Sequence, residues 1–159
     1  MALPNPKLDL KAADSAQAIA VAVSGERSGQ AYGETGRVLK KASADIRKQA
    51  AQRYARGDKI AEAIAGGMDG LIVALFEAVF GAERKDLTLC AVGGFGRGEL
   101  APYSDVDLLI LHPPDGDALA LEDLNRFLYP LWDSGVKVGH ATHTVKSALE
   151  FASHDIVGR

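Results

Sequence analysis

The stretch CAVGGFGRGELAPYSDVDLLIL, residues 90–111, decides the fold because it links two short apolar runs through a glycine-rich loop. The runs cover residues 87–92 and 106–111; the first ends at a glycine pair and the second is soon followed by prolines. Short apolar runs bounded by such residues are typical of buried strands. The stretch therefore predicts a strand, a loop, and a second strand that opens on Asp105 and Asp107.

Apolar residues recur at helical spacing on both sides of this stretch. Two N-terminal helices are expected at residues 35–54 and 59–80, and two further helices at 117–134 and 146–153. Alternation over residues 136–145 predicts a third strand. This order predicts an α/β domain in which a small mixed β-sheet with flanking helices follows the two N-terminal helices.

Single residues predict how these helices end or bend. Gly81 and Gly135 are placed to stop two of them, and Pro130 is expected to kink or shorten its helix. The pair Gly66–Gly67 is a candidate bend, and Thr144 is placed to cap the last helix.

The N-terminal part of the chain carries weaker signals. Residues 1–36 combine prolines with alanine, serine and glycine, without a sustained period, so they are expected to form a flexible leader with at most a short helix at 12–23. The folded domain is expected to cover residues 37–159. The sequence stops at Arg159 directly after HDIVG, so the final element looks cut short and we expect this domain to be truncated at its C-terminal side.

The composition argues against several classes of protein. The net charge of -3 shows no basic excess, so we expect no nucleic-acid partner and no membrane-surface partner. No apolar run approaches the roughly 20 residues of a membrane span. The single cysteine, Cys90, lies in an apolar run and is expected to be a buried thiol. These features favour a cytoplasmic protein.

Three phosphate-binding templates compete for the glycine loop. A P-loop requires a lysine, and this loop has none. The dinucleotide fingerprint is met formally by Gly96, Gly98 and Ala101, but it must run straight into a long helix, whereas here Pro102 and a strand follow. The third template is a strand that ends in Gly-Gly, a loop, and then Asp-x-Asp at the start of the next strand. Every part of the third template is present.

The spacing of the two aspartates explains what this template can do. Residues i and i+2 of a strand point to one face, so Asp105 and Asp107 would present two carboxylates to the same space. Mg²⁺ is usually held by one or two carboxylates together with substrate phosphates. Glycines let the backbone approach those phosphates, and Arg97 could bond a phosphate oxygen. The chemistry inferred is attack of a hydroxyl on the α-phosphorus, with pyrophosphate as leaving group.

Simpler interpretations of the same residues stay open. Asp-x-Asp at a strand start can be a solvated edge, and Gly-Gly after a strand can be only a turn. The basic face of the helix at 35–54 can be a solvated surface or can meet a phosphate. A nucleotide-binding module without catalysis also fits the pattern.

Two segments closely resemble the bacterial PII uridylyltransferases of the polymerase-β-like nucleotidyltransferase superfamily: VGGFGRGELAPYSDVDLLIL (92–111) and LWDSGVKVGHATHTVKSALEFASHD (131–155). The resemblance runs from about Val38 to the C-terminus. It implies a polymerase-β-like fold and transfer of UMP from UTP, with Mg²⁺ or Mn²⁺, to a tyrosine of the PII nitrogen-regulatory protein. A related adenylyltransferase of the glutamine synthetase type shares the motif. The motif therefore does not determine whether UTP or ATP is the substrate.

The resemblance also implies roles for individual residues. The implied metal ligands and catalytic carboxylates are Asp105 and Asp107. The implied nucleotide-binding residues are Gly93, Gly94, Arg97 and Ser104.

A third carboxylate is usual in this superfamily, and the strand at 136–145 offers none. Asp155 is the nearest candidate for this catalytic role. The alternatives are His140, His143, or a base outside this segment. The full family members continue into a metal-dependent HD domain that removes UMP and into paired ACT domains that sense glutamine. Both are expected to be absent here, so the segment need not be active alone.

Overall fold

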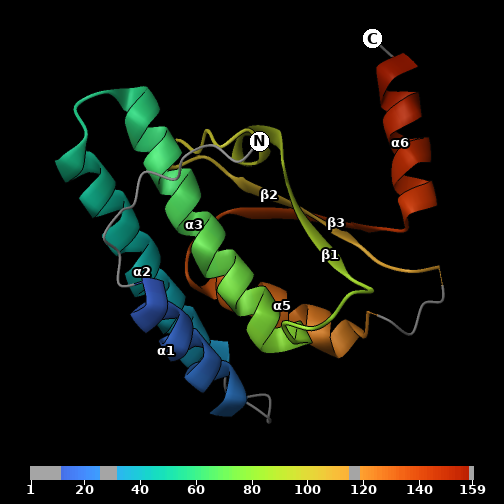
Figure 1. The fold of residues 1–159 in the computed structure, drawn as a ribbon, viewed down its shortest axis with the longest axis horizontal. Coiled ribbons are helices and arrows are strands. Elements are labelled where there is room, and N and C mark those ends of the chain that lie inside the picture. The colour runs from blue at the N-terminus through green and yellow to red at the C-terminus, as the bar shows by residue number, and fades with distance from the viewer. Residues whose placement is uncertain (1–11, 26–31, 115–118, 158–159) are drawn as a thin grey trace.

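The computed structural model describes residues 12–25, 32–114 and 119–157, with the side chains of 12, 13, 25, 32 and 154–157 left outside that description. Figure 1 shows three long helices on one side of a small sheet. The elements, in chain order, are α1 (Ala12–Gly25), α2 (Tyr32–Arg53), α3 (Gly57–Phe80), β1 (Thr88–Val92), α4 (Gly93–Gly96), β2 (Val106–Leu111), α5 (Leu121–Asp133), β3 (Val138–His143) and α6 (Val145–Val157).

The sheet is mixed, as the sequence predicts. Its strand order is β1-β2-β3, with β1 antiparallel and β3 parallel to the central β2. The parallel pair requires a crossover, which α5 supplies between β2 and β3. The prediction of an α/β domain with a small mixed sheet and flanking helices is confirmed.

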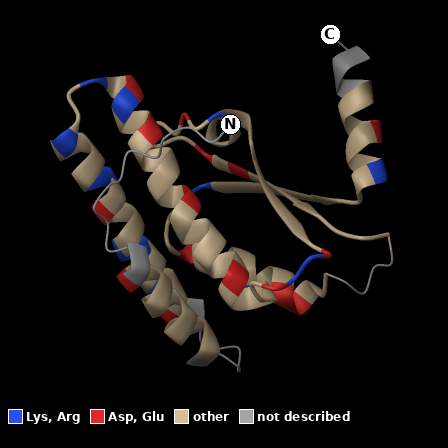
Figure 2. Ribbon diagram, viewed as in Figure 1, with Lys and Arg blue, Asp and Glu red and all other residues tan. Residues whose placement is uncertain are grey.

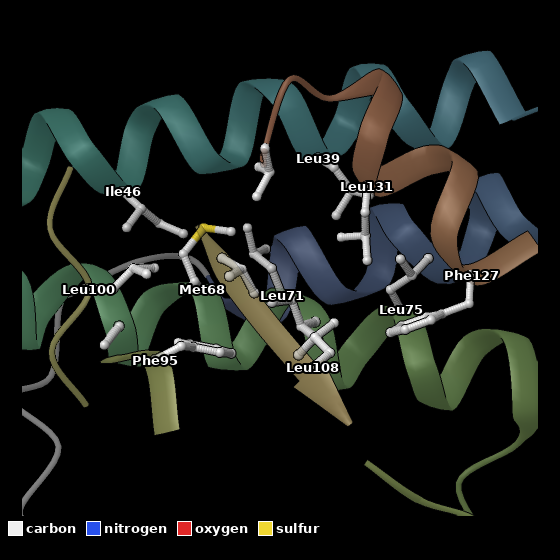
Figure 3. Close-up of a cluster of buried hydrophobic side chains, with 14 of the residues drawn as sticks. Leu39, Ile46, Met68, Leu71, Leu75, Phe95, Leu100, Leu108, Phe127 and Leu131 are labelled. Carbon is white, nitrogen blue, oxygen red and sulfur yellow. The ribbon is translucent and has the colours of Figure 1, made fainter. Parts of the chain in front are cut away.

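One face of β2 faces the helices. Val106, Leu108 and Ile110 alternate along the strand and are at most 2% exposed. They join a core with residues of α2, α3 and α5, and Figure 3 shows Leu108 in this cluster together with Leu75 and Phe127. The intervening residues of β2 are only partly buried. The period-2 pattern read from the sequence therefore gives the strand one core face and one open face.

The long helices pack on one another as well as on the sheet. α1, α2 and α3 contact each other pairwise, and α2 also packs against α5. Gly67 allows α2 and α3 to approach closely, since a β-carbon at this position would lie 2.8 Å from Ile46 Cγ2. The helix is continuous through Gly66–Gly67, and the second glycine of this pair serves the close contact with α2.

The expected leader is partly folded. The short helix considered at 12–23 is present as α1, and it buries Ile19 and Val23 against α3. α2 begins at Tyr32, so the expected boundary at residue 36 falls inside a helix. The described residues 12–25 therefore form a helix that contributes Ile19 and Val23 to the core. Residues 1–11 and 26–31 lie outside the described part.

The helix ends follow the predicted signals. Gly81 closes α3 with φ 92°, and Gly135 follows α5 with φ 79°; both conformations favour glycine. Pro130 lies inside α5, one turn from its end, without stopping it. Thr144 Oγ1 accepts a hydrogen bond from Ser147 N at 3.1 Å, which confirms the predicted cap of α6.

Two expectations about apolar residues need correction. Within the described residues, α3 alone is long and apolar enough to cross a membrane by length and composition, whereas no such run was expected. A buried core helix passes the same test, and α3 buries Ile64, Ile72 and Leu75 in the domain. Cys90 is only partly buried, because its register partner Leu109 belongs to the open face of β2.

Candidate functional site

Both aspartates of the motif lie away from the core. Asp105 directly precedes β2 and is exposed, whereas Asp107 is the second residue of the strand and is half-buried. Val106 between them is 1% exposed, which anchors the strand and directs its neighbours to the open face. Lys137 Nζ lies 4.0 Å from Asp105 Oδ1, a distant ion pair between exposed side chains. Figure 2 shows the acidic residues at this end of β2.

Asp107 lies near the start of β2, the central strand of the sheet. Its register partners are Val92, the last residue of β1, and Gly139 in β3. Gly93 follows Val92 with φ 61°, and a β-carbon there would lie 2.9 Å from Asp107 Oδ2. The glycine predicted to hold a triphosphate therefore also leaves room for the carboxylate. Strand pairing therefore brings Gly93, the first glycine of the pair, next to Asp107.

The glycine loop is held by its backbone and by two apolar side chains. One turn of helix, α4, follows β1, and the amide of Glu99 donates to Gly94 O at 2.9 Å. Phe95 and Leu100, both at most 5% exposed, anchor the loop in the core. A β-carbon at Gly96 would lie 2.5 Å from the carbonyl oxygen of Ala91, so this glycine permits the turn itself. The loop is thus a defined turn and not a long helix start.

Arg97 and Ser104 lie at the two ends of this loop. Arg97 is exposed, and its Nε lies 3.5 Å from Glu99 Oε2. An exposed pair of this kind contributes little to stability, so the guanidinium can exchange its partner for an anion. Ser104 Oγ donates to Ala101 O at 2.9 Å, which fixes the turn before Asp105. The structure therefore gives Ser104 a backbone contact next to the carboxylates.

Arg47 is a residue of this region that sequence reasoning did not single out. Its Nε donates to Pro102 O at 2.9 Å and so ties α2 to the loop that leads into Asp105. The basic face of α2, visible in Figure 2, was interpreted as either solvated or phosphate-binding. A contact across 55 residues has no local signature, so only the packing of α2 reveals it.

The two histidines of β3 lie apart from the aspartates. His140 projects to the face opposite Asp107, and its ring contacts Trp132 with centroids 5.7 Å apart. His143 lies four residues along β3 from the position that pairs with Asp107. Its Nδ1 is 3.2 Å from Ser147 Oγ, at the start of α6. These contacts favour structural roles for both rings.

Asp155 belongs to α6, whose backbone the structure describes. Because β3 runs parallel to β2, α6 begins at the end of the sheet remote from Asp107 (Figure 1). The side chain of Asp155 lies outside the described residues, so its catalytic role stays a prediction.

The donor set fits a hard divalent cation completed by substrate. Asp105 and Asp107 supply carboxylates, and the space bounded by Gly93 and Gly139 is one that a β-carbon would fill. No group of three or more histidine, cysteine, aspartate or glutamate side chains gathers in the described part of the chain. Two carboxylates with substrate phosphates are a usual arrangement for Mg²⁺.

The groups with a resolved electrostatic shift lie elsewhere in the described chain. Hydrogen bonds from Arg84, at 2.6 and 2.9 Å, hold the pKa of Asp86 below its usual value. Asp86 precedes β1, whose first residue pairs with Leu111 at the opposite end of β2 from Asp107. This ion pair therefore belongs to the sheet's other end.

Comparison with known proteins agrees with this geometry. The model of the nucleotidyltransferase domain family matches residues 76–149, which run from α3 to α6 and include the whole sheet. Residues 76–149 therefore form a segment that belongs to the nucleotidyltransferase domain family. Its small mixed sheet with flanking helices agrees with the polymerase-β-like nucleotidyltransferase fold expected from the sequence.

The chain is similar to parts of longer bifunctional enzymes. Over 122 residues, 72% of its length, it is 39% identical to the bifunctional uridylyltransferase/uridylyl-removing enzyme of Phenylobacterium zucineum and 38% identical to that of Caulobacter vibrioides. It is 36% identical over 128 residues to the enzyme of the same name from Gluconobacter oxydans. The chain spans 13% of the length of each of these relatives. No solved structure matches it significantly.

Proposed function

We propose that this domain transfers UMP from UTP to a tyrosine of the PII nitrogen-regulatory protein, using Mg²⁺ or Mn²⁺. The proposal is carried by one observation: the Asp107 carboxylate lies against the glycine turn that ends β1. The proposal is supported because a carboxylate, a type of group that can bind a metal, lies beside a loop that a triphosphate can approach. The uridylyl specificity rests on the names of the relatives, which are uridylyltransferases.

Each residue of the motif has a proposed task. Asp105 and Asp107 hold the divalent metal, which when bound supplies positive charge to the phosphates of the nucleotide. Gly93 and Gly94 let the triphosphate lie close to the backbone. Arg97 gives a charge-assisted hydrogen bond to a phosphate oxygen. Ser104 is proposed to contact the nucleotide. Its hydrogen bond to Ala101 O fixes the turn before Asp105.

The base that accepts the proton of the tyrosine hydroxyl is proposed to be a third carboxylate. Asp155 is the candidate within this chain, and a base outside this segment is the alternative because α6 begins at the end of the sheet remote from Asp107. Proton transfer from the hydroxyl leaves the oxygen free to attack the α-phosphorus, and the P–O bond to pyrophosphate breaks. We place the reaction in the cytoplasm, with PII and a nucleoside triphosphate as partners.

The test is a transfer assay that varies both nucleotide and target. The chain, within any longer protein that carries it (below, the longer protein), is incubated with PII or glutamine synthetase, Mg²⁺, and radiolabelled UTP or ATP. Label from UTP on PII tyrosine is expected, and it should disappear when the metal is chelated. Label from ATP on glutamine synthetase instead would replace the proposal by adenylyl transfer.

A nucleotide-binding module without catalysis gives a third result. It would bind UTP in equilibrium dialysis but label neither target. The same assay on the isolated chain separates the domain's own capacity from that of the longer protein.

A further inference from the structure

Gly139 is the residue of β3 that lies beside Asp107 in the parallel register. Paired residues of neighbouring strands project to the same face, so a side chain at 139 would share the space of the Asp107 carboxylate. A β-carbon built on Gly139 would lie 2.7 Å from Asp107 Oδ1. Carbon and oxygen in weak C–H···O contact normally lie about 3.3–3.6 Å apart. The carboxylate could not keep its position beside an alanine.

The backbone does not explain why this position is glycine. Positive φ angles occur at Gly81, Gly93, Gly98 and Gly135, and Gly139 is not one of them. A glycine within a strand weakens the strand, because it packs no side chain and costs more chain entropy on folding. Glycine at position 139 therefore lowers the stability of the strand, and no positive φ angle requires a glycine there.

The Asp107 carboxylate is bounded by glycine on both sides. The β-carbon missing from Gly93 would meet Oδ2 at 2.9 Å, and the one missing from Gly139 would meet Oδ1 at 2.7 Å. Gly93 directly follows β1, and Gly139 lies in β3, so the two glycines come from the two sides of β2. Together they leave free the space that the carboxylate occupies.

We propose that Gly139 is a positioning residue of the nucleotidyltransferase site, which keeps the Asp107 carboxylate in the orientation that binds the metal. The proposal rests on the function proposed above. It follows that an alanine at 139 would force the Asp107 side chain to rotate away, while strand β3 would still form. The substitution should therefore weaken metal binding more than it lowers the stability of the fold.

The test compares Gly139→Ala with Gly70→Ala in the full chain. Gly70 is exposed on α3 and has nothing within 4 Å of its absent β-carbon, so it controls for the substitution itself. Mn²⁺ binding is followed by electron paramagnetic resonance with and without UTP, and Tm by circular dichroism. Gly139→Ala should weaken Mn²⁺ binding at least tenfold with a small change in Tm, and Gly70→Ala should leave Mn²⁺ binding unchanged.

The transfer reaction of the longer protein gives a second readout. Gly139→Ala should raise the Mn²⁺ concentration needed for half-maximal rate, with excess Mn²⁺ restoring part of the rate. Unchanged Mn²⁺ affinity in a folded Gly139→Ala variant would overturn the proposal. A wild-type chain that binds no Mn²⁺ would overturn the proposed metal site and this inference together, whereas transfer to a different target would leave the inference standing.

A double-mutant cycle covers the case in which Gly139→Ala is poorly folded. In Asp107→Ala the opposing carboxylate is gone, so adding Gly139→Ala should destabilise the chain much less than it does in wild type. An equal loss of Tm in both backgrounds would show that the contact with Asp107 is not the cause, and would reject the positioning role.

Discussion

The two faces of β2 differ in what their side chains do. The face with Val106, Leu108 and Ile110 is buried against the helices, whereas the face with Asp107 and Leu109 is only partly covered. The single strand β2 thus contributes one face to the core and the other face to the candidate site. The difference teaches that tight packing on one face fixes the geometry of the other, because residues 107 and 108 cannot move independently.

The largest expected effect tests the buried face. Leu108→Ala removes a side chain that is 2% exposed and should cost about 2–5 kcal/mol of unfolding free energy. Leu109→Ala is the matched control, since the same substitution falls on the next residue but on the open face. Urea denaturation measures both. Equal losses of unfolding free energy in the two variants would mean that the two faces of β2 contribute equally to stability.

The next effect tests the open face. Asp107→Asn keeps the shape of the side chain but removes its charge, so transfer by the longer protein should fall at least roughly 100-fold, equivalent to about 2.7 kcal/mol. Its unfolding free energy should stay within about 0.5 kcal/mol of wild type. Asp69→Asn, on the exposed side of α3, is the control for the charge change. Retained activity in Asp107→Asn contradicts its role as a metal ligand.

A smaller effect is expected where the helical layer supports the site. Arg47→Gln removes the hydrogen bond to Pro102 O and should cost about 0.5–1.5 kcal/mol of stability. The loop before Asp105 loses its tie to α2, so the transfer rate should fall roughly tenfold, about 1.4 kcal/mol. Lys48→Gln removes an exposed charge from the same helix and should change neither property. A normal rate in Arg47→Gln would show that the loop needs no such tie.

The smallest effect lies at the other end of the sheet. The pKa of Asp86 is lowered by hydrogen bonds from Arg84, so the ionised form is favoured in the folded chain. Its contribution is therefore present above the ordinary pKa of an aspartate and is lost as pH falls through the lowered value. Asp86→Asn should reduce Tm slightly at pH 7 and not at all near pH 2. A Tm loss that is independent of pH would exclude the ion pair as its cause.

The sequence predicts the strands around the motif closely. Residues 106–111 were expected as a strand and form β2 with the same bounds, because alternation and flanking breakers are local signals. α1 was harder to interpret, since its buried Ile19 and Val23 stand among alanines that suit a leader equally well. Their burial depends on α3, a partner distant in sequence.

The residues of the candidate site also fall into two groups, those that the sequence predicts and those that only the structure reveals. Asp105, Asp107 and the glycine pair lie within one stretch, so their types and spacing are sufficient to propose phosphate and metal chemistry. Arg47 and Gly139 escape such reasoning, because each reaches the site through a pairing between separate elements. Gly139 left one weak signal, a glycine inside an alternating strand.

By itself, the sequence determined the order of the elements, the mixed α/β character of the domain and the carboxylates at the start of β2. These properties depend on side-chain period and on residues close in the chain. Only the tertiary structure decided that α1 joins the core, that His140 turns away from the aspartates, and that two glycines bound the Asp107 carboxylate. Each of these depends on strand register or helix packing, which brings together atoms that local sequence cannot relate.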